Sequence, residues 1–193
     1  MSIANYSDLQ TAIGNWLHRG DLTSVIPDFI SLAESKLNRR LRLRAMENTA
    51  TGTVAQSVSL PTGYVGMRSL TVNSGSTSYP LTCIPPSEVQ GNNDAPLSYS
   101  ISGDSLYFEP YSSSYSYTLN YYKSFDALSG GVNWLITNAP DVYLYASLVE
   151  AAPYIKDNER VSLYAQLLET AISNLEKSDR KDRYGSDLVV KAC

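Results

Sequence analysis

Apolar residues recur at helical spacing at both ends of the chain and at alternating positions in its middle. Near the N-terminus two apolar stripes predict two helices, one through Leu9, Ala12, Ile13, Trp16 and Leu17 and one through Phe29, Ile30, Ala33, Leu37 and Leu41. Ser7 with Gln10 suits a capping box at the start of the first helix, and Gly20 suits its end. The second helix is expected to start near Pro27, because proline suits the first helical position. The short connection predicts that the two helices pack as an antiparallel pair.

In the middle of the chain the period changes to two, which is typical of half-buried antiparallel strands. The clearest run alternates Tyr115, Tyr117, Leu119 and Tyr121 with Ser116, Thr118 and Asn120. Turns are predicted at residues 73–76 and 102–104, where glycine interrupts the alternation. Val54, Val58 and Leu60 are predicted to share one face of a single strand.

Helical spacing returns after Trp134, with a helix start at Pro140 and a kink or end at Pro153. Asp157 is expected to cap the last helix. The apolar stripe of that helix is formed by Val161, Tyr164, Ala165, Leu168, Ala171, Ile172 and Leu175. Beyond the stripe the helix turns fully polar, so we expect this end to project from its own domain as far as Gly185.

The order of these elements predicts an α+β fold, in which the N- and C-terminal parts form an antiparallel helical bundle and a small antiparallel β-domain is inserted between them. Residues 1–47 and 131–185 supply the helices, residues 48–130 the β-domain and residues 186–193 a tail. Neither helical part can bury its apolar stripe alone. The insertion costs little because closure entropy grows slowly with loop length.

The composition limits the range of possible functions. The chain of 193 residues has a net charge of -4, which argues against a free-standing nucleic-acid binder. We expect no secretory signal, because the N-terminus lacks a basic region followed by an apolar run. We expect no membrane contact, because no apolar run approaches the roughly 20 residues that cross a bilayer. Cys83 and Cys193 lie far apart, so neither a disulfide framework nor a metal site is expected.

Candidate catalytic groups are sparse. The one histidine, His18, lies at a predicted helix end, where its charge would favour the helix dipole. Gly63 and Gly66 lack the further glycines and the following helix of a phosphate-binding loop. We therefore expect no enzyme, no catalytic residue and no cofactor, although a pair of carboxylates of the glycosidase type stays open as an alternative.

Arg39, Arg40, Arg42 and Arg44 fall within six residues at the end of the second predicted helix. Either they form a solvated helix end with cations that suit the dipole, or they contact acidic neighbours or DNA phosphates. Because they spread around the helix, we expect contacts with neighbouring subunits or a partner protein rather than base reading.

The chain has 15 tyrosines and 3 phenylalanines. Tyrosine packs strand faces, and it is also rich at protein interfaces because it buries a large rigid area and still offers a hydroxyl group. Tyr111, Tyr122 and Tyr143 fall off the main apolar stripes, so we expect them at subunit interfaces.

Several short apolar and aromatic segments resemble podophage head-to-tail adaptors of the tail-tubular-protein-A type. The segments are Leu60 to Tyr64, Tyr79-Pro80-Leu81, Tyr99 to Gly103, Leu106 to Pro110, Leu119-Asn120-Tyr121-Tyr122, Asn133-Trp134-Leu135, Pro140 to Tyr145 and Ala151 to Tyr154. The resemblance covers most of residues 5 to 180. It implies a virion protein, assembled in the host cytoplasm, that forms a ring of typically twelve copies between the portal protein and the tail nozzle protein. Genomic DNA would pass through the ring without sequence recognition during ejection, and no cofactor is implied.

Two further points stay open at this stage. The alternative function is a tail or baseplate component whose tyrosine-rich β-domain binds a glycan. Leu188, Val189 and Val190 form an apolar triplet near the end of the chain, which we expect to dock onto the portal protein. The alternative for this triplet is a frayed tail or one that folds back on its own β-domain.

Overall fold

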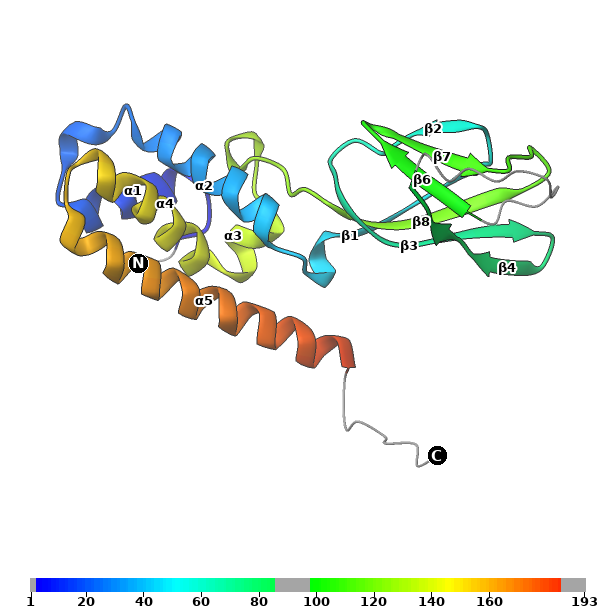
Figure 1. Cartoon of the computed structure of the whole chain (residues 1–193). Helices are drawn as coiled ribbons and strands as arrows, with labels where there is room; N and C mark the ends of the chain where they lie inside the picture. Colours follow the sequence, from blue (N-terminus) through cyan, green and yellow to red (C-terminus); the bar gives the residue numbers. More distant parts are fainter. Residues whose placement is uncertain (1–2, 86–97, 185–193) are drawn as a thin grey trace. The chain divides into compact units, whose positions relative to one another are not determined.

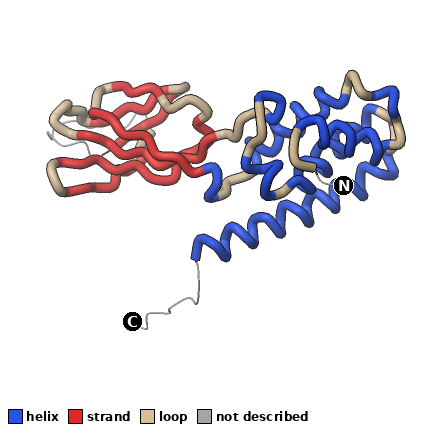
Figure 2. Tube along the Cα trace, turned by 180° about the vertical axis from the view of Figure 1, so that it is seen from behind, coloured by secondary structure: helices blue, strands red, loops and turns tan. Residues whose placement is uncertain are grey.

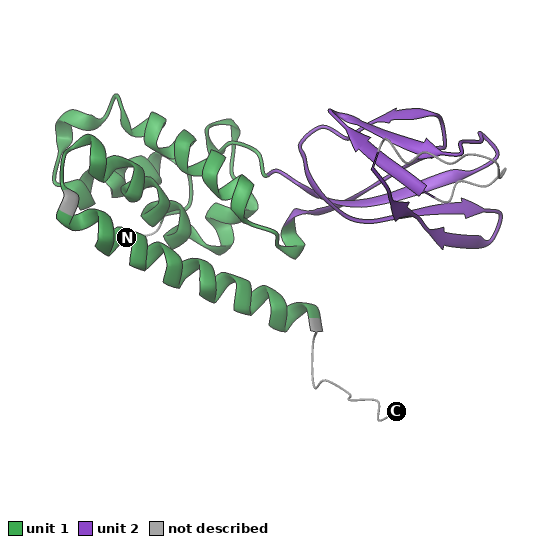
Figure 3. Ribbon diagram, viewed as in Figure 1, with its two compact units in different colours: residues 1–45, 125–193 green, residues 46–124 purple. Residues whose placement is uncertain are grey.

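The computed structural model describes residues 3–85 and 98–184, and its helices and strands are labelled in Figure 1. The helices come from the two ends of the chain and the strands from its middle (Figure 2). The chain forms two compact units, residues 1–45 with 125–193 and residues 46–124 (Figure 3). The class is α+β, as the sequence predicted.

The helical unit is organised around α4. Its helices are α1 (Tyr6–Leu17), α2 (Ile26–Arg40), α3 (Trp134–Asn138), α4 (Pro140–Tyr154) and α5 (Asn158–Tyr184), with short 3-10 helices at Gly20–Leu22 and Leu128–Gly130. α4 packs against each of the other four helices. A helix that is contacted on several sides has to be apolar nearly all round. The buried residues of α4 are Val142, Tyr143, Leu144, Ala146, Ser147, Leu148, Ala151 and Ala152.

The ends of α1 differ from the prediction. The side chain of Asn5, not that of Ser7, accepts the first capping hydrogen bond, from the N–H of Asp8 at 3.0 Å. The Asp8 carboxylate in turn accepts a bond from the side-chain amide of Asn5 at 3.0 Å, so the reciprocal cap lies two residues earlier. The helix ends at Leu17 because His18 adopts a left-handed conformation with φ 52°, before Gly20 is reached.

The other helix signals agree with the structure. Pro27 lies in the first turn of α2, and α4 begins at Pro140. α4 ends one residue after Pro153, which has no N–H for the helical ladder. The Asp157 carboxylate accepts a hydrogen bond from the N–H of Arg160 at 3.2 Å, which confirms the predicted cap of α5. Within the described ranges, none of the helices combines the length and the apolar character that crossing a bilayer requires.

The β unit consists of two four-stranded sheets. Sheet A contains, in spatial order, β1 (Glu47–Thr53), β8 (Ser116–Lys123), β3 (Tyr64–Ser74) and β4 (Thr77–Pro80), all antiparallel to their neighbours. Sheet B contains β2 (Ser57–Ser59), β7 (Ser105–Glu109), β6 (Ser98–Ser102) and β5 (Thr82–Cys83), in which β5 and β6 pair in parallel. The single strand predicted through Val54, Val58 and Leu60 is wrong, because the chain leaves sheet A after β1 and enters sheet B at β2.

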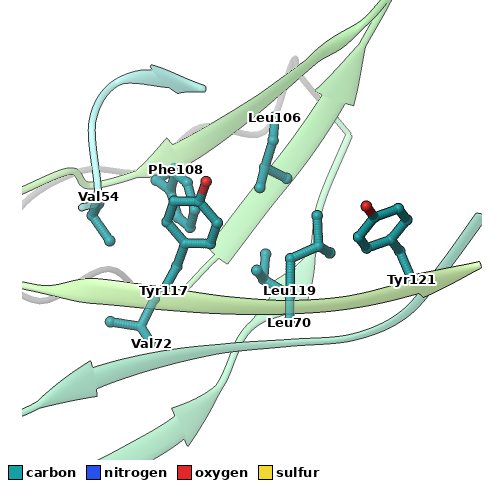
Figure 4. Close-up of a cluster of buried hydrophobic side chains, with 8 residues drawn as sticks. All are labelled: Val54, Leu70, Val72, Leu106, Phe108, Tyr117, Leu119 and Tyr121. Atoms are coloured by element: carbon teal, nitrogen blue, oxygen red, sulfur yellow. The ribbon is translucent and has the colours of Figure 1, made fainter. Parts of the chain in front are cut away.

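The two sheets enclose the core of the β unit. Figure 4 shows its eight buried side chains, Val54, Leu70, Val72, Leu106, Phe108, Tyr117, Leu119 and Tyr121. The alternation predicted for β8 is therefore confirmed by the burial of its residues 117, 119 and 121. Gly52 lies opposite Tyr117 in the β1–β8 register. A Cβ at this glycine would come within 2.8 Å of the tyrosine ring, so the glycine allows the ring to lie over β1.

The segment after Ser124 belongs to the helical unit, whereas the sequence prediction assigned residues up to 130 to the β-domain. Phe125 is buried, and its ring packs edge-on against the rings of Trp134 and Tyr143. The N–H of Phe125 also donates to the side chain of Asn38 at 2.9 Å. These contacts fix the chain to the helices where it leaves β8.

Candidate interaction site

The four arginines near the end of α2 do not act as one group. Arg40 forms a bidentate ion pair with Glu169 of α5, with nitrogen–oxygen distances of 2.5 and 2.6 Å. The hydrogen bond from Arg40 holds the pKa of Glu169 below its usual value, and the pKa of Arg40 is raised in return. Both side chains are largely exposed, so the pair contributes at most about 1 kcal/mol to stability.

Arg44 connects the segment after α2 with the polar end of α5 through hydrogen bonds and an ion pair. Its backbone N–H donates to the Asp179 carboxylate at 3.0 Å, and its guanidinium group lies 3.4 Å from the Asp182 carboxylate. Asp179 also pairs with Arg183 one helical turn along α5. This end of α5 was expected to project from its own domain; in the structure it contacts that domain through these polar pairs, and the apolar stripe does not continue there.

Arg39 and Arg42 are placed differently. Within the described part of the chain, their hydrogen bonds go to backbone carbonyl groups, from Arg39 to Ser35 and from Arg42 to Asn38 and Leu41. Both residues are exposed. Their charge is therefore available to a neighbouring protein, whereas Arg40 and Arg44 already face carboxylates of their own chain.

Tyr143 is not a surface residue. Its side chain is 0% exposed, its hydroxyl group donates to Glu34 at 3.0 Å, and it accepts a bond from the Asn133 amide at 2.7 Å. Burial raises the pKa of this hydroxyl group well above its usual value. The expectation that Tyr143 contacts a neighbouring subunit is corrected here, because α4 is enclosed by helices and has no outward face at this position.

The other two tyrosines can reach a partner. Tyr111 lies between β7 and β8 and is 55% exposed, while Tyr122 is half-buried on β8. The sequence reasoning missed Tyr79, which stands at the edge of sheet A and is 39% exposed. Its exposure depends on its position on an edge strand, which the sequence pattern alone does not reveal.

The buried carboxylate of Glu34 holds the segment that leads from β8 to α3 through hydrogen bonds. Glu34 of α2 lies among core residues, and one oxygen of its carboxylate accepts hydrogen bonds from the N–H of Leu128, at 2.7 Å, and from the Tyr143 hydroxyl. Asn133 donates to the Tyr143 hydroxyl and to the backbone of Asp126. The only available signal was the position of Glu34 among the apolar positions of α2.

Metal-ligand clusters and groups with a shifted pKa are the features that would indicate chemistry among the described residues. Within residues 3–85 and 98–184, no three His, Cys, Asp or Glu side chains come together as ligands of a metal ion. His18 is an exposed residue at the end of α1. Burial raises the pKa of Tyr99 to about 12, with a smaller effect of the neighbouring Cys83. The groups whose pKa is shifted belong to ion pairs or are partly or fully buried tyrosines.

The described surface thus carries exposed arginine and tyrosine side chains of the kind that protein partners contact. A family model described as SU10 adaptor protein matches residues 4–191, and the chain belongs to this family. It is a phage adaptor protein, and hence a virion component that binds other virion components. A comparison with curated proteins found no match.

Proposed function

We propose that the chain is the head-to-tail adaptor of a short-tailed phage. Twelve copies form a ring that joins the portal protein to the tail nozzle protein, and genomic DNA passes through the ring during ejection. The match to the adaptor family over residues 4–191 carries this proposal, because it spans both units of the chain. The proposal includes an antiparallel arrangement of the long helices as a bundle that contacts the portal.

The proposed contacts between subunits use Arg39 and Arg42, whose exposed charges have only backbone partners among the described residues, together with Tyr111 and Tyr122. Arginine and tyrosine are both enriched at protein interfaces. Arg40 and Arg44 remain candidates for the same interface, but a partner would have to compete with their own carboxylates.

A glycan-binding tail component is the less favoured function. Sugar recognition would need tyrosine rings that are open to solvent. Tyr117 and Tyr121 lie in the core of the β unit, and the ring of Tyr64 stacks on that of Tyr121. The β unit therefore has fewer exposed aromatic platforms than its tyrosine content suggested.

Leu188, Val189 and Val190 lie outside the described residues, and their docking onto the portal remains a proposal from the sequence. Deleting residues 185–193 is expected to leave the thermal midpoint nearly unchanged and to abolish co-purification with the portal protein of the same phage. The full-length chain, expressed with the same portal protein, is the control. Undiminished co-purification of the truncated chain would show that these residues are not the docking element.

A further inference from the structure

Sheet A has an open strand at each edge. Within the described residues, β1 pairs only with β8, and β4 pairs only with β3. An open edge carries backbone N–H and C=O groups that another strand can pair with, and proteins usually protect such edges with charges, prolines or very short strands. The two edges of sheet A differ in this protection.

The edge of β1 is regular and almost uncharged. The N–H of Val54 donates to the carbonyl group of Tyr115 at 2.9 Å and continues the β1–β8 register. Because the direction of backbone groups alternates along an antiparallel strand, the backbone groups of Thr51 and Thr53 face away from β8. No charged residue lies between Asn48 and Thr53. β1 therefore presents a template for a further strand.

The edge of β4 is shorter. The N–H of Leu81 donates to the carbonyl group of Leu70 at 3.1 Å in the β3–β4 register, so the backbone groups of Ser78 and Pro80 face away from β3. Pro80 has no N–H. This edge can therefore make one complete pair of backbone hydrogen bonds, at Ser78, which limits the contact to a short strand.

On the outer face of the sheet, both edges carry polar side chains that can pair with each other. Ser78 donates to Asn73 at 2.6 Å, and Asn73 donates to Thr118 at 3.1 Å, which forms a polar row over three strands. Thr51 lies opposite Thr118 on the fourth strand. A further copy placed edge to edge would bring its Ser78 next to Thr51, so that the polar row would continue.

On the inner face of the sheet, the side chains of the two edges are complementary in size. Tyr79 pairs with the buried Val72 and so lies on the core side of β4, yet it is 39% exposed because no strand lies beyond it. On the core side of β1 the corresponding position is Ala50, while the space at the next inward position, Gly52, is taken by the ring of Tyr117. One edge thus offers a large ring and the other edge offers the small side chain of Ala50 on the same side.

We propose that β4 of one copy pairs antiparallel with β1 of the next copy, with Ser78 opposite Thr51 and Tyr79 over Ala50. The direction is consistent, because β1 and β4 run antiparallel to each other in sheet A. Such a head-to-tail contact uses two different surfaces, and it closes into a ring when the rotation between copies divides a full turn. The inference rests on the ring of the proposed function and names the strands that join it.

The test is a disulfide between copies. Thr51→Cys and Ser78→Cys are introduced together into a chain that carries Cys83→Ser and Cys193→Ser, and the chain is assembled on the portal protein of the same phage. Within one copy these positions lie three strand spacings, about 14 Å, apart. A disulfide requires Cα atoms within about 7 Å, so an oxidised product must join two copies.

Oxidation is expected to give a ladder of multimers larger than dimers on a non-reducing denaturing gel. The matched control combines Ser78→Cys with Ser116→Cys, which is exposed on the same face of β8 but away from the edge, and it should stay monomeric. Each single cysteine variant should stay monomeric too. Unchanged circular dichroism confirms folding of all variants.

Electron microscopy of the same samples distinguishes a failure of the proposed strand pairing from a failure of the proposed ring. A ring without a ladder, or with dimers alone, would overturn the pairing of β1 with β4 and leave the proposed ring intact. The absence of both the ring and the ladder would overturn the ring and the pairing together.

Discussion

Replacing Phe108 with alanine is expected to lower the free energy of unfolding by about 3–5 kcal/mol, which is typical of a fully buried phenylalanine. Phe108 is 0% exposed, and its ring lies 5.4 Å from the ring of Tyr117, so the substitution leaves a cavity between the two sheets. Urea titration followed by circular dichroism measures the effect.

Tyr111→Ala is the matched control for Phe108→Ala, because Tyr111 belongs to the same unit and is 55% exposed. Its substitution is expected to change the free energy of unfolding by no more than about 0.5 kcal/mol. Equal effects of the two substitutions would contradict the enclosed core of the β unit.

Glu34→Ala is expected to lower the free energy of unfolding by about 2–3 kcal/mol, because a buried donor without its acceptor costs about 1–3 kcal/mol. Glu34 accepts hydrogen bonds from Leu128 and Tyr143, and the substitution removes both acceptor contacts. Thermal and urea unfolding measure the loss.

Glu34→Gln keeps an acceptor oxygen at the same place and is expected to recover most of the stability. Tyr143→Phe provides a separate check on the same buried group, since it removes only the hydroxyl. A Tyr143→Phe chain with unchanged stability and weakened assembly would show that Tyr143 contacts a neighbour, against its burial in the helical unit.

Local signals in the sequence predicted most of the secondary structure. The end of α4 follows from Pro153, and the cap of α5 follows from Asp157, because each effect acts within a few residues. The alternation along β8 correctly identified Tyr117 and Tyr121 as core residues. The passage from β1 to β2 was missed, since the sheet that a short strand joins depends on pairing with distant strands.

The candidate interaction site was less predictable because its partners are distant in sequence. Arg40 and Glu169 are 129 positions apart, and no local pattern connects them. Tyr143 looked like an interface residue because it lies off one apolar stripe, but a helix enclosed by four others has no single stripe. The residue types therefore indicated which side chains could contact a partner. Which of them are exposed could be seen only in the tertiary structure.

Electron microscopy of the adaptor bound to the portal protein of the same phage tests the central claim most directly. The chain belongs to a phage adaptor family, and the account predicts a closed ring of twelve copies on the axis of the portal. The portal alone and the chain alone are imaged in parallel as controls. Complexes that carry only one or two copies of the chain, bound away from the portal axis, would contradict the account.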